Sequence, residues 1–138
     1  MKYLPQIAAV LLGTLFGLFS LLFLLNLAPA PPPPPEGTPI AHFMSAFGTT
    51  GYLTFVKVLE LVGGILVAIP LTRRLGLVVL GPILVNIFAC HLFVMGAGSL
   101  FAGSSVPLWA ITALFFYLMW HERVPFIRAV ISNRGAAA

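Results

Sequence analysis

The sequence predicts an all-α membrane protein, a bundle of four transmembrane helices with a short interfacial helix in the first outer loop. Of its 138 residues, 60% are hydrophobic and only 7% are charged, and the mean hydropathy is +1.09. In a soluble domain, about a quarter of the residues are charged. So few charges could not cover the apolar surface of a chain of this size, and lipid is therefore the expected solvent.

Four apolar segments predict the four spans, and we treat residues 1–138 as one membrane domain. The spans cover about residues 7–28, 52–69, 75–94 and 106–122. The first three are long enough to cross a hydrocarbon core of about 30 Å at about 1.5 Å per helical residue. The fourth is shorter, so we expect it to draw on flanking residues to reach both interfaces.

The segments outside the spans are an outer loop, residues 29–51, and a tail, residues 123–138. The prolines of the loop predict a stiff polyproline spacer, and Thr38 followed by Pro39 predicts the start of a short helix. An apolar face on that helix places it at the outer membrane surface. The tail predicts a second short interfacial helix. Signal cleavage after the first span is not expected, because that apolar run is too long for a signal peptide.

The positions of lysine and arginine predict the orientation. These residues precede the first span, lie between the second and third, and follow the fourth, whereas residues 29–51 and 95–106 contain none. Basic loops stay in the cytoplasm. We therefore expect a multi-pass protein of the bacterial cytoplasmic (inner) membrane with both termini in the cytoplasm.

Polar residues inside the second and third spans form a candidate ligand-binding cluster. Lys57 and Glu60 are three positions apart, so they lie on one helix face and can pair. Counting depth along the two spans puts Asn86 level with Glu60, and His91 level with Lys57. Charged groups in a membrane normally point into the bundle and have partners. We therefore expect a polar cluster of Lys57, Glu60, Asn86 and His91 in the outer half of the bundle.

Three interpretations of the cluster remain open: an ion pair that fixes helix register, a pocket that binds a small polar or quinone-like head group, and a lysine that merely reaches the interface. We expect no comparable cluster in the cytoplasmic half, and we expect Glu122 to lie at a solvated helix end. Gly13 and Gly17 are four positions apart and predict close helix packing, most simply within the chain.

Several site classes are excluded or disfavoured. The histidines lie in different parts of the sequence, and Cys90 is the only cysteine, so no metal site is predicted. The single thiol cannot form a dithiol relay. No stretch forms a basic patch on a solvent face, so we expect no nucleic-acid partner. The expected partners are the lipid bilayer and either another envelope protein or a second copy of the chain.

Three stretches resemble the DoxX-like small membrane proteins of bacteria. They are KVLELVGGILV in the second span, PILVNIFACHLF in the third, and the loop APAPPPPPEG. The resemblance covers about residues 5–122 and implies a four-helix membrane bundle. It also implies that recurrent family positions are occupied by Lys57, Glu60, Gly63, Gly64, Pro82, Asn86 and His91.

The resemblance implies an accessory or scaffold subunit of an envelope redox or stress-response complex, because some relatives are linked to quinone-dependent thiosulfate oxidation or to oxidative and thiol stress. On that hypothesis the chain has no catalytic residue and no activity on its own, and quinone or another lipophile is its only expected ligand. One alternative is a quinone-interacting oxidoreductase subunit in which Glu60 and His91 exchange protons with a head group held near Asn86. The other is a small-solute carrier or lipophile-binding protein.

Overall fold

The computed structural model describes residues 3–29 and 32–135, with side chains described as far as residue 123. Within that part of the chain every regular element is a helix. The longer ones are α1 (Leu4–Leu24), α2 (Pro39–Gly48), α3 (Tyr52–Ala68), α4 (Arg73–Ala89) and α5 (Val106–Gly135). Between α4 and α5 lie a π-helical turn, Cys90–Val94, and two 3-10 turns, Ala97–Phe101 and Gly103–Ser105.

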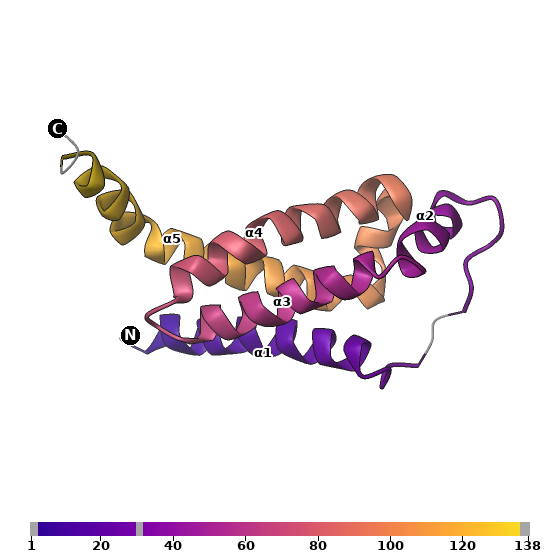
Figure 1. Ribbon diagram of the computed structural model, residues 1–138, viewed down its shortest axis with the longest axis horizontal. Helices are drawn as coiled ribbons and strands as arrows, with labels where there is room; N and C mark the ends of the chain where they lie inside the picture. The colour runs from indigo at the N-terminus through magenta and orange to yellow at the C-terminus, as the bar shows by residue number, and fades with distance from the viewer. Residues whose placement is uncertain (1–2, 30–31, 136–138) are drawn as a thin grey trace.

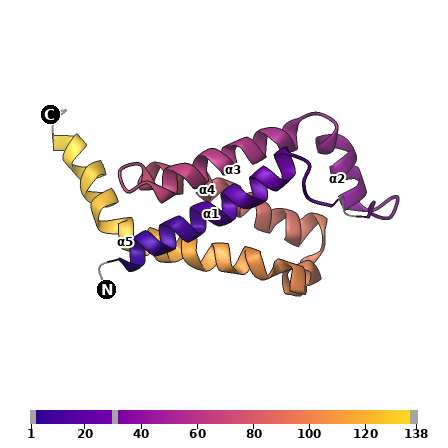
Figure 2. The same ribbon diagram turned by 90° about the horizontal axis from the view of Figure 1, so that it is seen from below.

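Helices α1, α3, α4 and α5 lie side by side, and α2 caps one end of them (Figure 1). Figure 2 shows α1 lying across α3 and α5. The start of α1, the α3–α4 turn and the C-terminal part of α5 share one end, which we call the arginine end after Arg73, Arg74 and Arg123. The opposite end, with α2 and residues 90–105, we call the loop end.

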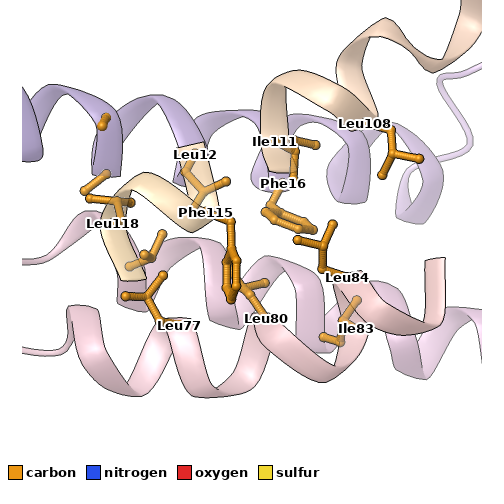
Figure 3. Packing of buried hydrophobic residues seen from close by; sticks show 13 residues of the cluster. Leu12, Phe16, Leu77, Leu80, Ile83, Leu84, Leu108, Ile111, Phe115 and Leu118 are labelled. Atoms are coloured by element: carbon orange, nitrogen blue, oxygen red, sulfur yellow. The ribbon is translucent and has the colours of Figure 1, made fainter. Parts of the chain in front are cut away.

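One hydrophobic core joins these four helices (Figure 3). Its buried members include Leu12 and Phe16 of α1, Leu80 of α4, and Phe115 and Leu118 of α5. Many other large apolar side chains cover the outside, and single residues such as Val85 and Phe116 are 70% and 65% exposed. An outer surface this apolar is unusual for a soluble protein and suits contact with lipid.

Three helical segments are long and apolar enough to cross a membrane: Leu4–Leu24, Arg73–Val94 and Gly103–Arg123. Helix α3 reaches that standard only together with α2, to which it is joined at an angle of 80°. By length and composition, the described residues therefore contain three candidate spans, or four if this bent pair counts as one. The chain is therefore all-helical and compatible with a membrane protein.

The first helix ends earlier than the sequence predicts, at Leu24 rather than near Ala28. Asn26 has a φ of 52°, which is the left-handed conformation that closes many helices. The amides of Leu27 and Ala28 then turn back to the carbonyl oxygen of Leu22. Asparagine tolerates this conformation better than most residues, so it ends the helix although the apolar sequence continues.

Glycines let α1, α3 and α4 approach each other closely. A Cβ atom on Gly13 would overlap the carbonyl oxygen of Gly64 and lie 3.1 Å from the Cβ of Ala68. On the other side of α3, a Cβ on Gly63 would lie 2.6 Å from a methyl group of Leu80. Gly13 thus packs within the chain, as predicted. Of the two neighbouring glycines of α3, Gly64 contacts α1 and Gly63 contacts α4.

Two boundaries at the arginine end also differ from the prediction. Helix α4 begins at Arg73, so Arg73 and Arg74 form its first turn instead of belonging to a loop. The tail is not a separate helix, because α5 continues without a break to Gly135. Its C-terminal part turns away from the packed helices (Figure 1). Pro125 lies within α5, and a proline has no amide to hydrogen-bond the preceding turn.

Helix α2 begins as the sequence predicts. The Thr38 hydroxyl accepts a hydrogen bond from the amide of Ala41, and Pro39 is the first helical residue. The ring of Phe47 lies 4.8 Å from that of Tyr52 across the bend into α3. None of its residues is fully buried, so α2 rests on the other helices without entering their core.

Candidate functional site: a polar cavity near the loop end

The charged pair in α3 is formed as its spacing predicts. Lys57 Nζ lies 2.8 Å from Glu60 Oε2, and Ser20 of α1 donates a hydrogen bond of 3.2 Å to the same oxygen. The side chain of Glu60 is only 4% exposed, whereas that of Lys57 is 27% exposed. Lys57 also lies over the ring of Phe23, 5.9 Å from its centre. The carboxylate is thus buried between two helices, and its lysine partner lies nearer the surface.

A cavity of about 180 Å³ adjoins this pair. Its polar wall contains Lys57, Glu60, His91, Ser104 and Ser105. The rest of the wall is formed by apolar residues of α1, α4 and α5 together with Pro107: Phe16, Phe19, Ile87, Leu108 and Ile111. An apolar pocket with a few converging polar groups is the usual form of a small-molecule site.

His91 enters this cavity from a π-helical turn at the end of α4. In that turn the amide of Met95 bonds to the carbonyl oxygen of Cys90, five residues earlier. Such turns occur often at functional sites. The Nδ1 atom of His91 lies 2.9 Å from the carbonyl oxygen of Ile87. Because a carbonyl only accepts, Nδ1 must carry a proton in this contact, and Nε2 is the nitrogen left for another partner.

The prediction that Asn86 joins the cluster is wrong. Asn86 is exposed on the outside of α4 and does not line the cavity. Ile87 and His91, four positions apart, do line it. Since each helical position turns the side chain by about 100°, Asn86 faces away although its depth is right. His91 shares the cavity, but its hydrogen bond is to Ile87, not to either charge.

Two serines complete the polar wall, and the sequence did not indicate them as site residues. Ser105 is buried, and its hydroxyl donates to the carbonyl oxygen of Ser99. Ser99 in turn donates to the carbonyl oxygen of His91 at 3.2 Å. The loop after α4 is therefore tied back over the cavity. In sequence, Ser104 and Ser105 before Pro107 indicate only a helix start, because nothing local shows which wall they face.

Three further residues that the resemblance singled out, Gly63, Gly64 and Pro82, lie outside the cavity. The two glycines are buried where α3 contacts α1 and α4. Pro82 lies inside α4 and lines a different, larger cavity between α4 and α5. The two glycines therefore shape helix packing, and the chemistry of the polar cavity belongs to other side chains.

The cavity offers one acceptor that the protein leaves available. Among the described residues, Glu60 Oε2 takes both the lysine and the serine, and Oε1 receives no hydrogen bond. Oε1 and His91 Nε2 are therefore acceptors, through which the wall can hold a hydroxyl or an amide N–H group, whereas a carbonyl such as that of a quinone needs a donor, which the ammonium of Lys57 can supply. In the described part of the chain, no group of three or more His, Cys, Asp or Glu residues could hold a metal ion.

A second polar cluster lies at the arginine end, where none was expected. Glu122 bridges two arginines of α4: its Oε1 lies 3.4 Å from Arg73, and its Oε2 lies 3.1 Å from Arg74. Arg73 is buried and also donates to Gln6 of α1, whose amide donates to the carbonyl oxygen of Ala68. The side chain of Glu122 is 14% exposed, so it is not a solvated helix end.

Comparison of the chain with known protein families, curated proteins and solved structures finds no match. The function is therefore inferred from the chemistry of the two ends. The cavity beside Glu60 combines a buried carboxylate, an imidazole and two serines. The cluster around Glu122 is a bridge between helices.

Proposed function

We propose that this chain is an accessory subunit of a membrane complex that handles redox or stress chemistry in the bacterial envelope. In this proposal it binds the polar head group of a lipophilic molecule, such as a quinone, in the cavity beside Glu60. The single observation that carries the proposal is that cavity, in which a buried carboxylate keeps one oxygen available next to His91. Its apolar walls suit a molecule that reaches it from the bilayer.

The proposed membrane arrangement supports this role. We infer four spans, α1, α3, α4 and α5, with α2 at the outer surface and both termini in the cytoplasm. The arginine end then faces the cytoplasm, in agreement with the positive-inside rule. The loop end, and with it the cavity, lies toward the outer side, where an envelope complex would meet it.

A non-catalytic role is favoured by what the cavity contains. Its titratable groups are one amine, one carboxylate and one imidazole. None of these side chains exchanges electrons, and the single thiol, Cys90, is not among the residues that line it. The cavity can hold and orient a head group, and the electrons must come from a partner. The resemblance to DoxX-like proteins agrees with this division and stays a prediction.

The first test is native mass spectrometry of the protein extracted gently from its own membrane. We expect wild type to carry a bound lipophilic mass that is lost in Glu60→Gln, which keeps the shape of the side chain but removes its charge. Asn86→Ala is the matched control, because Asn86 is a polar residue of α4 outside the cavity. A wild-type chain without any bound mass would refute the binding role. If no other envelope protein co-purifies with the chain from its own membrane, the accessory role is refuted.

A quinone-interacting oxidoreductase subunit is the second candidate, and it is favoured by Glu60 and His91 lining one cavity. Reduction of a quinone to a quinol takes up two electrons and two protons. His91 and a protonated Glu60 could deliver the protons to the carbonyl oxygens, while a redox centre of a partner protein supplies the electrons. We then expect Glu60→Gln to slow quinone reduction in membranes while the quinone stays bound. Unchanged reduction in that variant would eliminate this candidate.

A further inference from the structure

A larger cavity, of about 410 Å³, lies between α4 and α5 and is independent of the proposed function. We call it the α4–α5 groove. Its walls are formed on the α4 side by Leu77, Val78, Gly81, Pro82 and Val85, and on the α5 side by Phe115, Phe116 and Met119. At the arginine end it is bordered by Arg74, Glu122 and Arg123. Gly81 and Pro82 widen it, since neither carries a long side chain.

The polar and apolar parts of this groove are strictly separated. All its charged residues are at the arginine end, and the rest of its lining is apolar. At that end Arg74 and the buried Arg73 share the single carboxylate of Glu122, and Arg123 lies on the same border of the groove, so the described side chains there carry three positive charges against one negative charge. The groove therefore has the polarity of an amphiphile with an anionic head.

The two arginines that border the groove are arranged to hold an anion. Arg74 bonds Glu122 through Nε, which leaves its two terminal nitrogens, and its side chain is 46% exposed. The guanidinium of Arg123 stacks 3.4 Å from the ring centre of Trp120. Stacking uses the flat face of the guanidinium and leaves its N–H groups, which lie in the plane, for a phosphate.

The length of the groove fits one leaflet. From Arg74 to Val85 it follows α4 for about 16 Å, at about 1.5 Å per residue. Half of a hydrocarbon core of about 30 Å is nearly the same length. Trp120, 68% exposed beside Arg123, is the kind of residue that marks the level of the head groups.

We propose that the α4–α5 groove binds one acyl chain of an anionic phospholipid, whose phosphate is held by Arg74 and Arg123. The apolar walls surround the acyl chain, and the excess of positive charge at the arginine end selects an anionic head group over a zwitterionic one. A lipid in this position fills the space between α4 and α5 and acts as part of the packing. It comes from the leaflet in which the arginine end lies.

A second copy of the chain fits the groove less well. The chain has only three acidic residues, Glu36, Glu60 and Glu122. Glu60 is buried against Lys57, Glu122 is already held by two arginines, and Glu36 lies in the loop between α1 and α2 at the other end. A copy that crosses the membrane in the same direction therefore has no free acidic side chain at this end to offer Arg74 and Arg123.

Fluorescence quenching by brominated lipids tests the proposal. Trp109→Phe leaves Trp120 as the only tryptophan, beside Arg123, and the protein is placed in phosphatidylcholine vesicles. We expect brominated phosphatidylglycerol to quench Trp120 at a lower mole fraction than brominated phosphatidylcholine. Each of Arg74→Gln and Arg123→Gln should lower this preference for the anionic lipid about five-fold. Arg74→Lys and Arg123→Lys keep the positive charge and should retain most of the preference. Trp109, observed alone in Trp120→Phe, should show no preference.

A variant that fills the groove separates a true lipid site from general attraction to charge. Gly81→Leu leaves every arginine in place, and a Cβ at this position would lie 3.5 Å from Phe115, an ordinary contact. We expect it to abolish the preference of Trp120 for the anionic lipid. Equal quenching by the two lipids would overturn the proposal, as would a preference that survives both Arg→Gln changes or the filling of the groove. Dimers cross-linked through groove residues would overturn it in favour of a second copy.

Discussion

Glu60 Oε2 lies 2.8 Å from Lys57 Nζ, one helical turn earlier on α3, and the two partners are buried to different degrees. The lysine, at 27% exposure, has some access to the surface, whereas the carboxylate, at 4%, has almost none. Ser20, which donates to the same oxygen, is fully buried. The stability of this part of the protein therefore depends on keeping the carboxylate neutralised.

We predict that Lys57→Met is more harmful than Lys57→Met combined with Glu60→Gln. The single change leaves a buried carboxylate without its cation and should destabilise the protein by about 2–3 kcal/mol. The double change removes both charges and should recover at least half of that loss. Thermal unfolding in a mild detergent, carried out as a double-mutant cycle, measures the difference. Equal stability of the single and double variants would mean that the pair is not coupled.

Two glycines of α1 should respond oppositely to the same substitution. Gly13→Ala forces a Cβ onto the carbonyl oxygen of Gly64 and should destabilise the protein by about 1–3 kcal/mol. Gly17→Ala is the matched control, since its Cβ would lie 3.9 Å from Leu61, and alanine favours helix. Unfolding in detergent should give Gly17→Ala the highest free energy of unfolding, wild type an intermediate value and Gly13→Ala the lowest. A tolerated Gly13→Ala would contradict the close contact of α1 with α3.

At the arginine end, Glu122→Gln should be more destabilising than Arg74→Gln. The first change leaves the buried Arg73 without its carboxylate and should lower stability by about 2 kcal/mol or more. The second removes a half-exposed partner and should lower it by less than about 1 kcal/mol. The measurement is again detergent unfolding at fixed protein and lipid concentration. The reverse order would show that Arg74, not Arg73, holds α4 to α5.

The proposed orientation predicts which cysteines react from outside the cell. In a Cys90→Ser background, Ala46→Cys in α2 should react with a membrane-impermeant maleimide in spheroplasts. Leu71→Cys, at a position that is 92% exposed in the α3–α4 turn, should react only after the membrane is opened. The control is the Cys90→Ser protein alone, which should not be labelled. Labelling of Leu71→Cys in closed spheroplasts would reverse the topology.

The sequence was most informative where partners are close neighbours along one helix. Lys57 and Glu60 pair because residues three apart share a helix face, whatever surrounds them. Thr38 caps α2 for the same local reason. Depth within the helices was also useful, since it placed His91 level with Lys57, and the two residues line the same cavity.

Depth alone failed for Asn86, because two residues at one level meet only if both side chains face the same interior. The direction in which Asn86 points depends on which side of α4 contacts α3 and α5, and hydropathy along an almost wholly apolar helix does not reveal that side. The bridge from Glu122 to Arg73 was missed for a related reason. A carboxylate near a predicted helix end, such as Glu122, is expected to be solvated unless the end of another helix lies beside it. Only the packing of the helices determines whether one does.

By itself, the sequence determined that the chain is helical, largely apolar and charged mainly at one end, because composition and spacing along the chain are local properties. It also determined the Lys57–Glu60 pair and the glycine contacts that α1 can make. The tertiary structure alone decided which residues surround Glu60, that α4 and α5 leave a groove between them, and that the groove ends at arginines. These features depend on how the helices rotate and cross, and that is set by the fit of Gly13, Gly63 and Gly64 against their neighbours.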